Sequence, residues 1–145
     1  MRALIQRVRW ATVEVGGDEV GRIGPGMLVF LGVERGDDAA RAEAMAARLL
    51  AYRVFADAAG RMNLDVRAAG GAVLLVSQFT LAADTARGLR PGFSTAAEPV
   101  AAEALYERVL AALRQRHAPV ACGVFGASMQ VSLCNDGPVT FLLQN

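Results

Sequence analysis

Apolar and polar residues alternate with a period of two in several parts of the chain, which predicts half-buried β-strands. The first such stretch runs from Ala3 to Val15, and its apolar face changes phase between residues 7 and 10. Because an extra residue in one strand shifts the phase in this way, we expect a β-bulge or bend there. The turn Gly16-Gly17-Asp18 leads into a short strand over residues 19–23. The uninterrupted apolar run over residues 27–33 predicts a strand covered on both faces.

Two segments instead carry apolar residues at the three- and four-residue spacing of an amphipathic helix. The first follows Gly36-Asp37-Asp38, which supplies candidates for the helix N-cap. The second begins at Pro99, a residue suited to the first turn of a helix, and ends before Pro119. The predicted buried positions are Ala42, Met45, Ala46, Leu49 and Leu50 in the first helix, and Ala101, Leu105, Val109, Ala112 and Leu113 in the second.

Short apolar runs complete the predicted strands, at residues 52–55, 72–76, 120–125, 128–133 and 139–143. The order is therefore strands, helix, strands, helix, strands, with hairpin-length turns at several points. We predict an α+β fold in a single domain, residues 1–145, with a mainly antiparallel, curved, barrel-like β-sheet and two principal helices. A doubly wound fold is disfavoured because strands and helices do not alternate regularly.

Composition narrows the classes of function without defining one. With 145 residues, 54% of them hydrophobic, the chain can bury a core as one ordinary domain. Its net charge of +1 gives no global field that attracts nucleic acid, although a local arginine cluster could hold a phosphate. No apolar run approaches 18 residues and the start of the chain resembles no signal segment, so we expect a cytoplasmic protein with no membrane partner.

The usual catalytic groups are scarce in this sequence. Cys122 and Cys134 stand in apolar surroundings at no metal-ligand spacing, which predicts two small buried hydrophobic residues. With His117 as the only histidine, we predict no metal site and no cofactor. Ser77 or Thr80 could act as a nucleophile, but each would need a base, and His117 follows a helix rich in surface charges.

Two stretches depart from the pattern of the core. Polar groups appear in Ser77-Gln78-Phe79-Thr80-Leu81, at the end of a predicted buried strand, which is a common place for a site. Asn135-Asp136-Gly137-Pro138-Val139-Thr140 puts turn-forming residues between two apolar runs, and we expect it to interrupt the sheet. Residues 84–97 lack periodicity and are long for a connection, as functional loops are. Backbone amides, hydroxyls and one side-chain amide would suit hydrolysis of an activated ester, which needs no strong side-chain base.

Arg7 is a third unusual feature, because it shares the phase of Ala3 and Ile5 on the first strand. A permanent cation then points toward the side that should be buried, and such an arginine needs partners. Either nearby carbonyls or a carboxylate pair with Arg7 for structural reasons, or Arg7 belongs to a functional site.

The stretches 77–81 and 135–140 together resemble the pair of signature motifs of the D-aminoacyl-tRNA deacylases, a family first known as D-tyrosyl-tRNA deacylases. The similarity covers the whole chain, including residues 3–8, Met62-Asn63-Leu64, Arg90-Pro91 and residues 129–133. It implies a homodimer, with the active site at the subunit interface, that binds the 3′ CCA end of tRNA. The enzyme would hydrolyse the ester between a D-amino acid, or mischarged glycine, and the terminal adenosine. This reaction is chiral proofreading in translation quality control.

The resemblance implies four catalytic positions. Ser77, Gln78, Phe79 and Thr80 would line the scissile ester, and the amides of Phe79 and Thr80 would face its carbonyl oxygen. The Thr80 hydroxyl would be either the nucleophile or a supporting group, with the ribose 2′-OH of the substrate activating water. We favour the second role, because no base stands near Thr80 in the sequence.

The resemblance also implies five substrate-binding positions. Gly137 and Pro138 would be joined by a cis peptide bond, would reach into the pocket of the other subunit, and would reject an L side chain by main-chain shape. Arg7 would brace this segment, and Phe125 and Met129 would form the wall around the adenosine. Two alternatives remain at this stage: a non-catalytic module that binds tRNA ends, and a small-molecule esterase with Thr80 as nucleophile.

Overall fold

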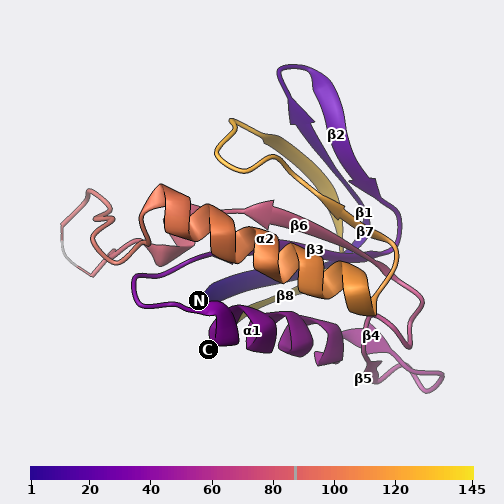
Figure 1. Ribbon diagram of the computed structural model, residues 1–145. Coiled ribbons are helices and arrows are strands. Elements are labelled where there is room, and N and C mark those ends of the chain that lie inside the picture. The colour runs from indigo at the N-terminus through magenta and orange to yellow at the C-terminus, as the bar shows by residue number, and fades with distance from the viewer. Residues whose placement is uncertain (87) are drawn as a thin grey trace.

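The fold is a curved six-stranded sheet with two helices packed on one of its faces (Figure 1). The computed structural model describes residues 1–86 and 88–145; Arg87, in the long loop of the sequence, lies outside the described residues. In chain order the elements are β1 (Arg2–Val15), β2 (Asp18–Ile23), β3 (Gly26–Gly32), α1 (Ala39–Ala51), β4 (Phe55–Ala56), β5 (Met62–Leu64), β6 (Ala72–Ser77), the 3-10 helix η1 (Phe79–Ala82), α2 (Pro99–Arg116), β7 (Val120–Cys122) and β8 (Gln130–Gln144).

β1 organises the sheet, because β2, β3 and β8 all pair with it in antiparallel fashion. β3 and β6 are parallel, as are β6 and β7, so the sheet is mixed at this side. Parallel neighbours need a long crossover connection, and α1 and α2 lie in the two crossovers. The predicted α+β class with a curved, barrel-like sheet and two helices is confirmed, and the parallel pairs are a feature that the sequence pattern did not distinguish.

The predicted irregularity in the first strand is present. The register between β1 and β8 shifts between Gln6 and Val8, and again between Val8 and Trp10. The predicted strand over residues 52–55 is wrong in its extent, because only Phe55 and Ala56 pair, with β5. The Val54 carbonyl instead accepts a hydrogen bond from Arg7 Nη1, 2.7 Å away.

The predicted strand over residues 120–125 is likewise too long. β7 ends at Cys122, and the chain then turns, with the Ala127 amide donating to the Val124 carbonyl at 3.3 Å. Cys122 and Cys134 are free thiols, and both are half-buried rather than fully buried.

The first helix matches its prediction closely. Asp38 is the N-cap, and its Oδ1 accepts from the Arg41 amide at 2.8 Å. All five residues predicted to be buried in this helix are buried. None of the helices in the described residues is long and apolar enough to span a bilayer.

The buried face of α2 differs from the predicted one by about one residue. Pro99 does occupy its first turn, but Ala101 is exposed and Leu105 is half-buried. Tyr106 is buried instead and donates its hydroxyl to the Leu75 carbonyl at 3.0 Å. An aromatic residue with a polar tip can be buried in this way when the tip finds an acceptor, and simple apolar spacing does not foresee it.

Two hydrophobic clusters hold the layers together. The larger cluster lies between the helices and the sheet, and the smaller one lies within the curve of the sheet, around residues of β1, β3 and β6. β2 bends over this smaller cluster so closely that a Cβ on Gly21 would lie 2.7 Å from the Cys122 carbonyl oxygen. The absence of a side chain at Gly21 therefore lets β2 approach β7 and nearly close the sheet.

Candidate functional site

A pocket of about 410 Å³ opens where β6 ends, between the start of α2 and the loop after β7. Five of the nine residues that the family resemblance singles out line this one pocket: Ser77, Gln78, Phe79, Phe125 and Met129. They come from segments some 50 residues apart in the sequence. The fold therefore brings the first signature stretch and the expected adenosine wall together.

Aromatic rings give the pocket its shape. Phe125 lies against Tyr106, with ring centroids 5.6 Å apart, so one wall of the pocket is anchored in the core. Phe79 is 61% exposed and its ring lies 5.1 Å from that of Phe93. Ala96 and Ala97, which line the pocket, and Phe93, which contacts Phe79 but does not itself line the pocket, belong to the loop 84–97. The length of this loop was the only signal for them in the sequence.

The turn η1 presents two unpaired main-chain donors beside the pocket. Gln78 still donates its amide to the Leu31 carbonyl at 2.8 Å, which extends the sheet ladder just beyond β6. The next two amides, of Phe79 and Thr80, have no acceptor among the described residues, as is usual for the first amides of a helix. Such donors can stabilise the oxyanion that develops when an ester is hydrolysed.

Gly32 allows η1 to pack tightly on the end of β3. A Cβ at Gly32 would lie 2.9 Å from Leu81 Cβ and 3.0 Å from the Gln78 carbonyl oxygen. Any larger residue would therefore displace the turn that carries the two free amides.

Thr80 is exposed and does not itself line the pocket. Its Oγ1 accepts a hydrogen bond from Gln78 Nε2 at 2.6 Å, which leaves the hydroxyl proton available for donation. His117 cannot serve it as a base, because His117 Nε2 lies 2.8 Å from the Gly71 carbonyl, at the opposite end of β6. Six residues of extended strand separate Gly71 from Ser77, about 20 Å.

The segment with Gly137 and Pro138 is a bulge rather than a turn between two strands. The expected turn between two strands is wrong, because β8 runs continuously through this segment, but the pairing of β8 with β1 is interrupted at residues 136–139. Gln6 of β1 pairs with Thr140 and Val8 pairs with Asn135, so Arg7 alone stands opposite residues 136–139. The Gly137–Pro138 peptide bond is cis.

Polar side chains close the bulge from both sides. The Val139 amide donates to Asn135 Oδ1 at 2.7 Å, and Asn135 Nδ2 donates back to the Val139 carbonyl at 3.2 Å. Arg7 Nε donates to the Asp136 carbonyl at 2.8 Å, and Nη1 donates to that of Val54 at 2.7 Å. The inward-pointing arginine thus has carbonyl partners, with the Asp136 carboxylate 3.5 Å away as its counter-ion.

Within one chain the bulge and the pocket lie apart. Arg7 pairs with Met27 on β3, whereas Ser77 pairs with Leu31 at the other end of that strand. Four residues along β3 correspond to about 13 Å. β8 reaches the pocket only at its start, through Val131, and six residues of extended strand, about 20 Å, separate Val131 from Gly137. Gly137 and Pro138 do not line the pocket that holds Ser77.

The fold and the pocket fit an ester hydrolase whose polar groups are mainly main-chain donors. A family model described as D-Tyr-tRNA(Tyr) deacylase matches residues 4–144. The chain therefore belongs to the D-aminoacyl-tRNA deacylase family, and it is a hydrolase.

Similar proteins agree over the full length of the chain. A D-aminoacyl-tRNA deacylase of Stutzerimonas stutzeri (strain A1501) is 61% identical over 145 residues, 100% of each chain. One of Azotobacter vinelandii (strain DJ / ATCC BAA-1303) is 61% identical over 144 residues, 99% of each. Among solved structures, the c-Myc DNA unwinding element binding protein superposes with a TM-score of 0.95 at 39% identity, covering 100% of this chain and 99% of that one. A probable eukaryotic D-amino acid tRNA deacylase has a TM-score of 0.83 at 17% identity, with 98% and 97% covered, a likeness of fold.

Proposed function

We propose that this protein hydrolyses the ester between a D-amino acid and the 3′-terminal adenosine of tRNA, giving the free D-amino acid and free tRNA. Mischarged glycine, which has no side chain to reject, would be removed in the same way. The observation that carries this proposal is the pocket in which Phe125 and Met129 face Ser77, Gln78 and Phe79 beside two free amides. The names of the similar proteins support the same substrate class.

In this proposal the adenosine lies against Phe125 and Met129, and the ester reaches toward η1. The amides of Phe79 and Thr80 donate to the carbonyl oxygen, where negative charge develops in the transition state. One such donor is worth about 10²- to 10³-fold in rate in other ester and amide hydrolases. The ribose 2′-OH activates the attacking water, and the Thr80 hydroxyl supports the arrangement as a donor.

Chirality is read by the main chain of the Gly137–Pro138 bulge in a second copy of the chain. Its carbonyls hold the substrate α-amino group and leave no room for an L side chain, while Arg7 braces the bulge. The separation of bulge and pocket within one chain supports this arrangement, because Arg7 and Ser77 pair with opposite ends of β3 and neither Gly137 nor Pro138 lines the pocket. We therefore propose a cytoplasmic homodimer with each active site at the subunit interface.

Deacylation assays on matched substrates test the chemistry. Purified protein should release D-tyrosine from D-tyrosyl-tRNA and glycine from mischarged glycyl-tRNA, and it should spare L-tyrosyl-tRNA. Equal rates on the D and L substrates would refute chiral proofreading. Binding of D-tyrosyl-tRNA without turnover would identify a tRNA-end-binding module instead, and a trapped covalent acyl group on Thr80 would identify a nucleophilic esterase.

Mixing two inactive variants tests the shared site. Phe79→Pro removes one amide donor from η1, and Gly137→Ala places a Cβ 2.6 Å from Val139 Cγ2 and distorts the bulge. If each site takes η1 from one subunit and the bulge from the other, mixed dimers regain one intact site. Random exchange of subunits should then restore roughly a quarter of wild-type activity. Mixtures that stay inactive after verified exchange would place both elements of a site in one chain.

A further inference from the structure

We propose that Arg2 and Glu34 are positioning residues for ester hydrolysis, because they fix η1 and the facing wall of the pocket relative to each other. Neither residue lines the pocket. The inference rests on the proposed function only in taking η1 as the segment that faces the ester. It adds a pair of charged residues that neither signature stretch contains.

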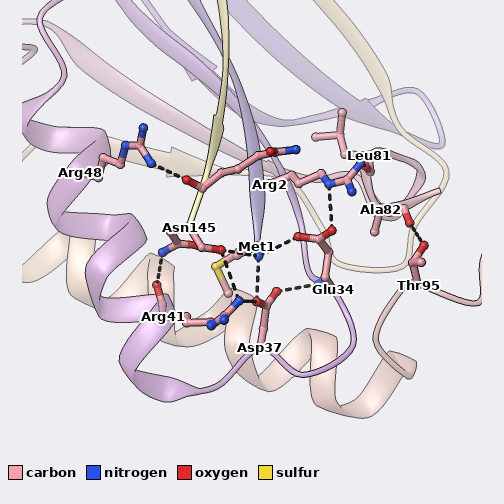
Figure 2. A network of polar contacts seen from close by, with 11 residues as sticks. Met1, Arg2, Glu34, Asp37, Arg41, Arg48, Leu81, Ala82, Thr95 and Asn145 are labelled. Atoms are coloured by element: carbon pink, nitrogen blue, oxygen red, sulfur yellow. Dashed lines mark hydrogen bonds and ion pairs between the residues drawn. The ribbon is translucent and has the colours of Figure 1, made fainter. Parts of the chain in front are cut away.

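Two side chains from outside η1 hold its carboxyl-terminal end. The last carbonyls of a short helix lack partners within the helix and need donors from elsewhere. Arg2 Nη1 donates to the Leu81 carbonyl at 3.2 Å, and the Thr95 hydroxyl donates to the Ala82 carbonyl. Figure 2 shows both contacts, with Arg2 reaching η1 from the start of β1. Movement of either donor would move the turn that carries the free amides.

Glu34 fixes the direction of the Arg2 guanidinium. Arg2 Nε lies 2.8 Å from Glu34 Oε1 and has no well-aligned hydrogen bond, so the contact is an ion pair. The other Glu34 oxygen accepts from the Met1 ammonium at 2.9 Å, and that ammonium also donates to Asp37 Oδ1 at 2.7 Å. Asp37 Oδ2 in turn accepts from the Glu34 amide at 2.7 Å (Figure 2). The Glu34 side chain and main chain are thus both held.

The main chain around Glu34 holds the opposite wall of the pocket. The Arg35 amide donates to the Thr95 carbonyl at 2.8 Å, and the Ala97 amide donates to the Val33 carbonyl at 3.1 Å. Ala97 lines the pocket. Residues 33–35 therefore hold the loop wall directly and hold η1 through Glu34 and Arg2. Together with the Thr95 hydroxyl, which joins the loop to the Ala82 carbonyl directly, this segment sets the spacing between the amide donors and the facing wall.

The Arg2–Glu34 pair should affect rate more than stability. The two side chains are 31% and 24% exposed, so water screens the ion pair only in part, and its loss should lower stability while the protein stays folded. Hydrolysis is far more sensitive, because a displacement of about 1 Å can cost on the order of 100-fold in rate. If the pair positions η1, kcat should therefore fall in variants that remain stably folded.

Arg2→Met and Glu34→Gln test the pair, and Arg41→Met is the matched control. Arg41 belongs to the same network, through Asp37 Oδ1 at 3.4 Å and the Asn145 carbonyl at 3.3 Å, but it does not contact η1 (Figure 2). We expect kcat on D-tyrosyl-tRNA to fall about 10-fold in both test variants, with KM changed less than about threefold. Arg2→Lys should recover only part of the loss, because one ammonium replaces a fork that contacts both Glu34 and the Leu81 carbonyl.

Amide exchange gives a readout independent of activity. The Leu81 and Ala83 amides donate within the turn, to the Gln78 carbonyl at 3.2 Å and the Thr80 carbonyl at 3.1 Å. Their exchange should accelerate in Arg2→Met and stay unchanged in Arg41→Met. Wild-type kcat in both test variants, an equal fall in the control, or unchanged exchange at Leu81 and Ala83 would each overturn the inference. A wild-type protein that hydrolyses no D-aminoacyl-tRNA would refute the proposed function, and this inference with it.

Discussion

Removal of the Arg7 guanidinium is the sharpest test of how the bulge is held. Arg7→Met keeps most of the aliphatic stem and deletes two hydrogen bonds, to the Asp136 carbonyl at 2.8 Å and the Val54 carbonyl at 2.7 Å. A hydrogen bond with one charged partner contributes about 1.5–3 kcal/mol. The Arg7 side chain is 17% exposed, so water can reach part of the vacated site and reduce the loss. We expect the free energy of unfolding to fall by roughly 3 kcal/mol.

Arg9→Met is the matched control for this change. Arg9 Nε contacts the same residue, at 3.3 Å from Asp136 Oδ1, but the Arg9 side chain is 73% exposed. An exposed ion pair is worth about 0–1 kcal/mol, so the control should be nearly as stable as the wild type.

Urea denaturation followed by circular dichroism measures the free energy of unfolding of both variants. Deacylation of D- and L-tyrosyl-tRNA shows whether the selectivity for the D substrate falls when the Arg7 contacts are removed. A loss below about 1 kcal/mol in Arg7→Met would refute the reasoning. An equal loss in both variants would show that the Asp136 carboxylate, rather than the two carbonyls, is the important partner.

Substitutions at three further positions test other parts of the structure. Thr80→Ala should keep kcat within about 10-fold of wild type if the hydroxyl only supports the reaction, and near-complete loss in single-turnover assays would show that it takes part in the chemistry. Tyr106→Phe should lower the free energy of unfolding by about 1–2 kcal/mol, because it removes the donor to the Leu75 carbonyl. Burial raises the pKa of Tyr106, which keeps this hydroxyl protonated. An unchanged melting temperature would contradict a stabilising role for this hydrogen bond. Asp38→Ala should cost about 1 kcal/mol by loss of the helix cap, whereas Asp38→Asn should cost much less in the same thermal melts.

The local sequence pattern was sufficient to predict those parts of the structure that depend on residues close together in the chain. Asp38 caps α1 because its side chain can reach the Arg41 amide three residues on, and apolar spacing then fixes the buried face of that helix. The phase change between residues 7 and 10 likewise predicted the irregularity of β1, whose register with β8 shifts on both sides of Val8. Tyr106 is the exception on α2, because its burial depends on a carbonyl of β6 that is remote in the sequence.

Contacts between distant segments could not be predicted from pattern. Asn135 through Thr140 has the composition of a turn, yet β1 pairs with the chain on both sides of it and keeps it in one strand. The parallel pairs of β6 depend on crossovers whose direction the strand pattern does not encode. Arg2 and Glu34 are ordinary charged residues in the sequence, and only the fold shows that they meet beside Leu81.

The two signature stretches were recognised together in the sequence but lie apart in one chain, and each contacts an arginine of β1. Arg2, at its start, contacts the turn that carries the free amides, and Arg7 contacts the bulge with Gly137. Five residues of extended strand place these two arginines about 17 Å apart, and a paired strand cannot shorten. If bulge and turn act on one ester, a second copy must supply one of them, and two-fold symmetry would then complete two sites at once. In such a dimer each β1 would brace the turn of one site and the bulge of the other.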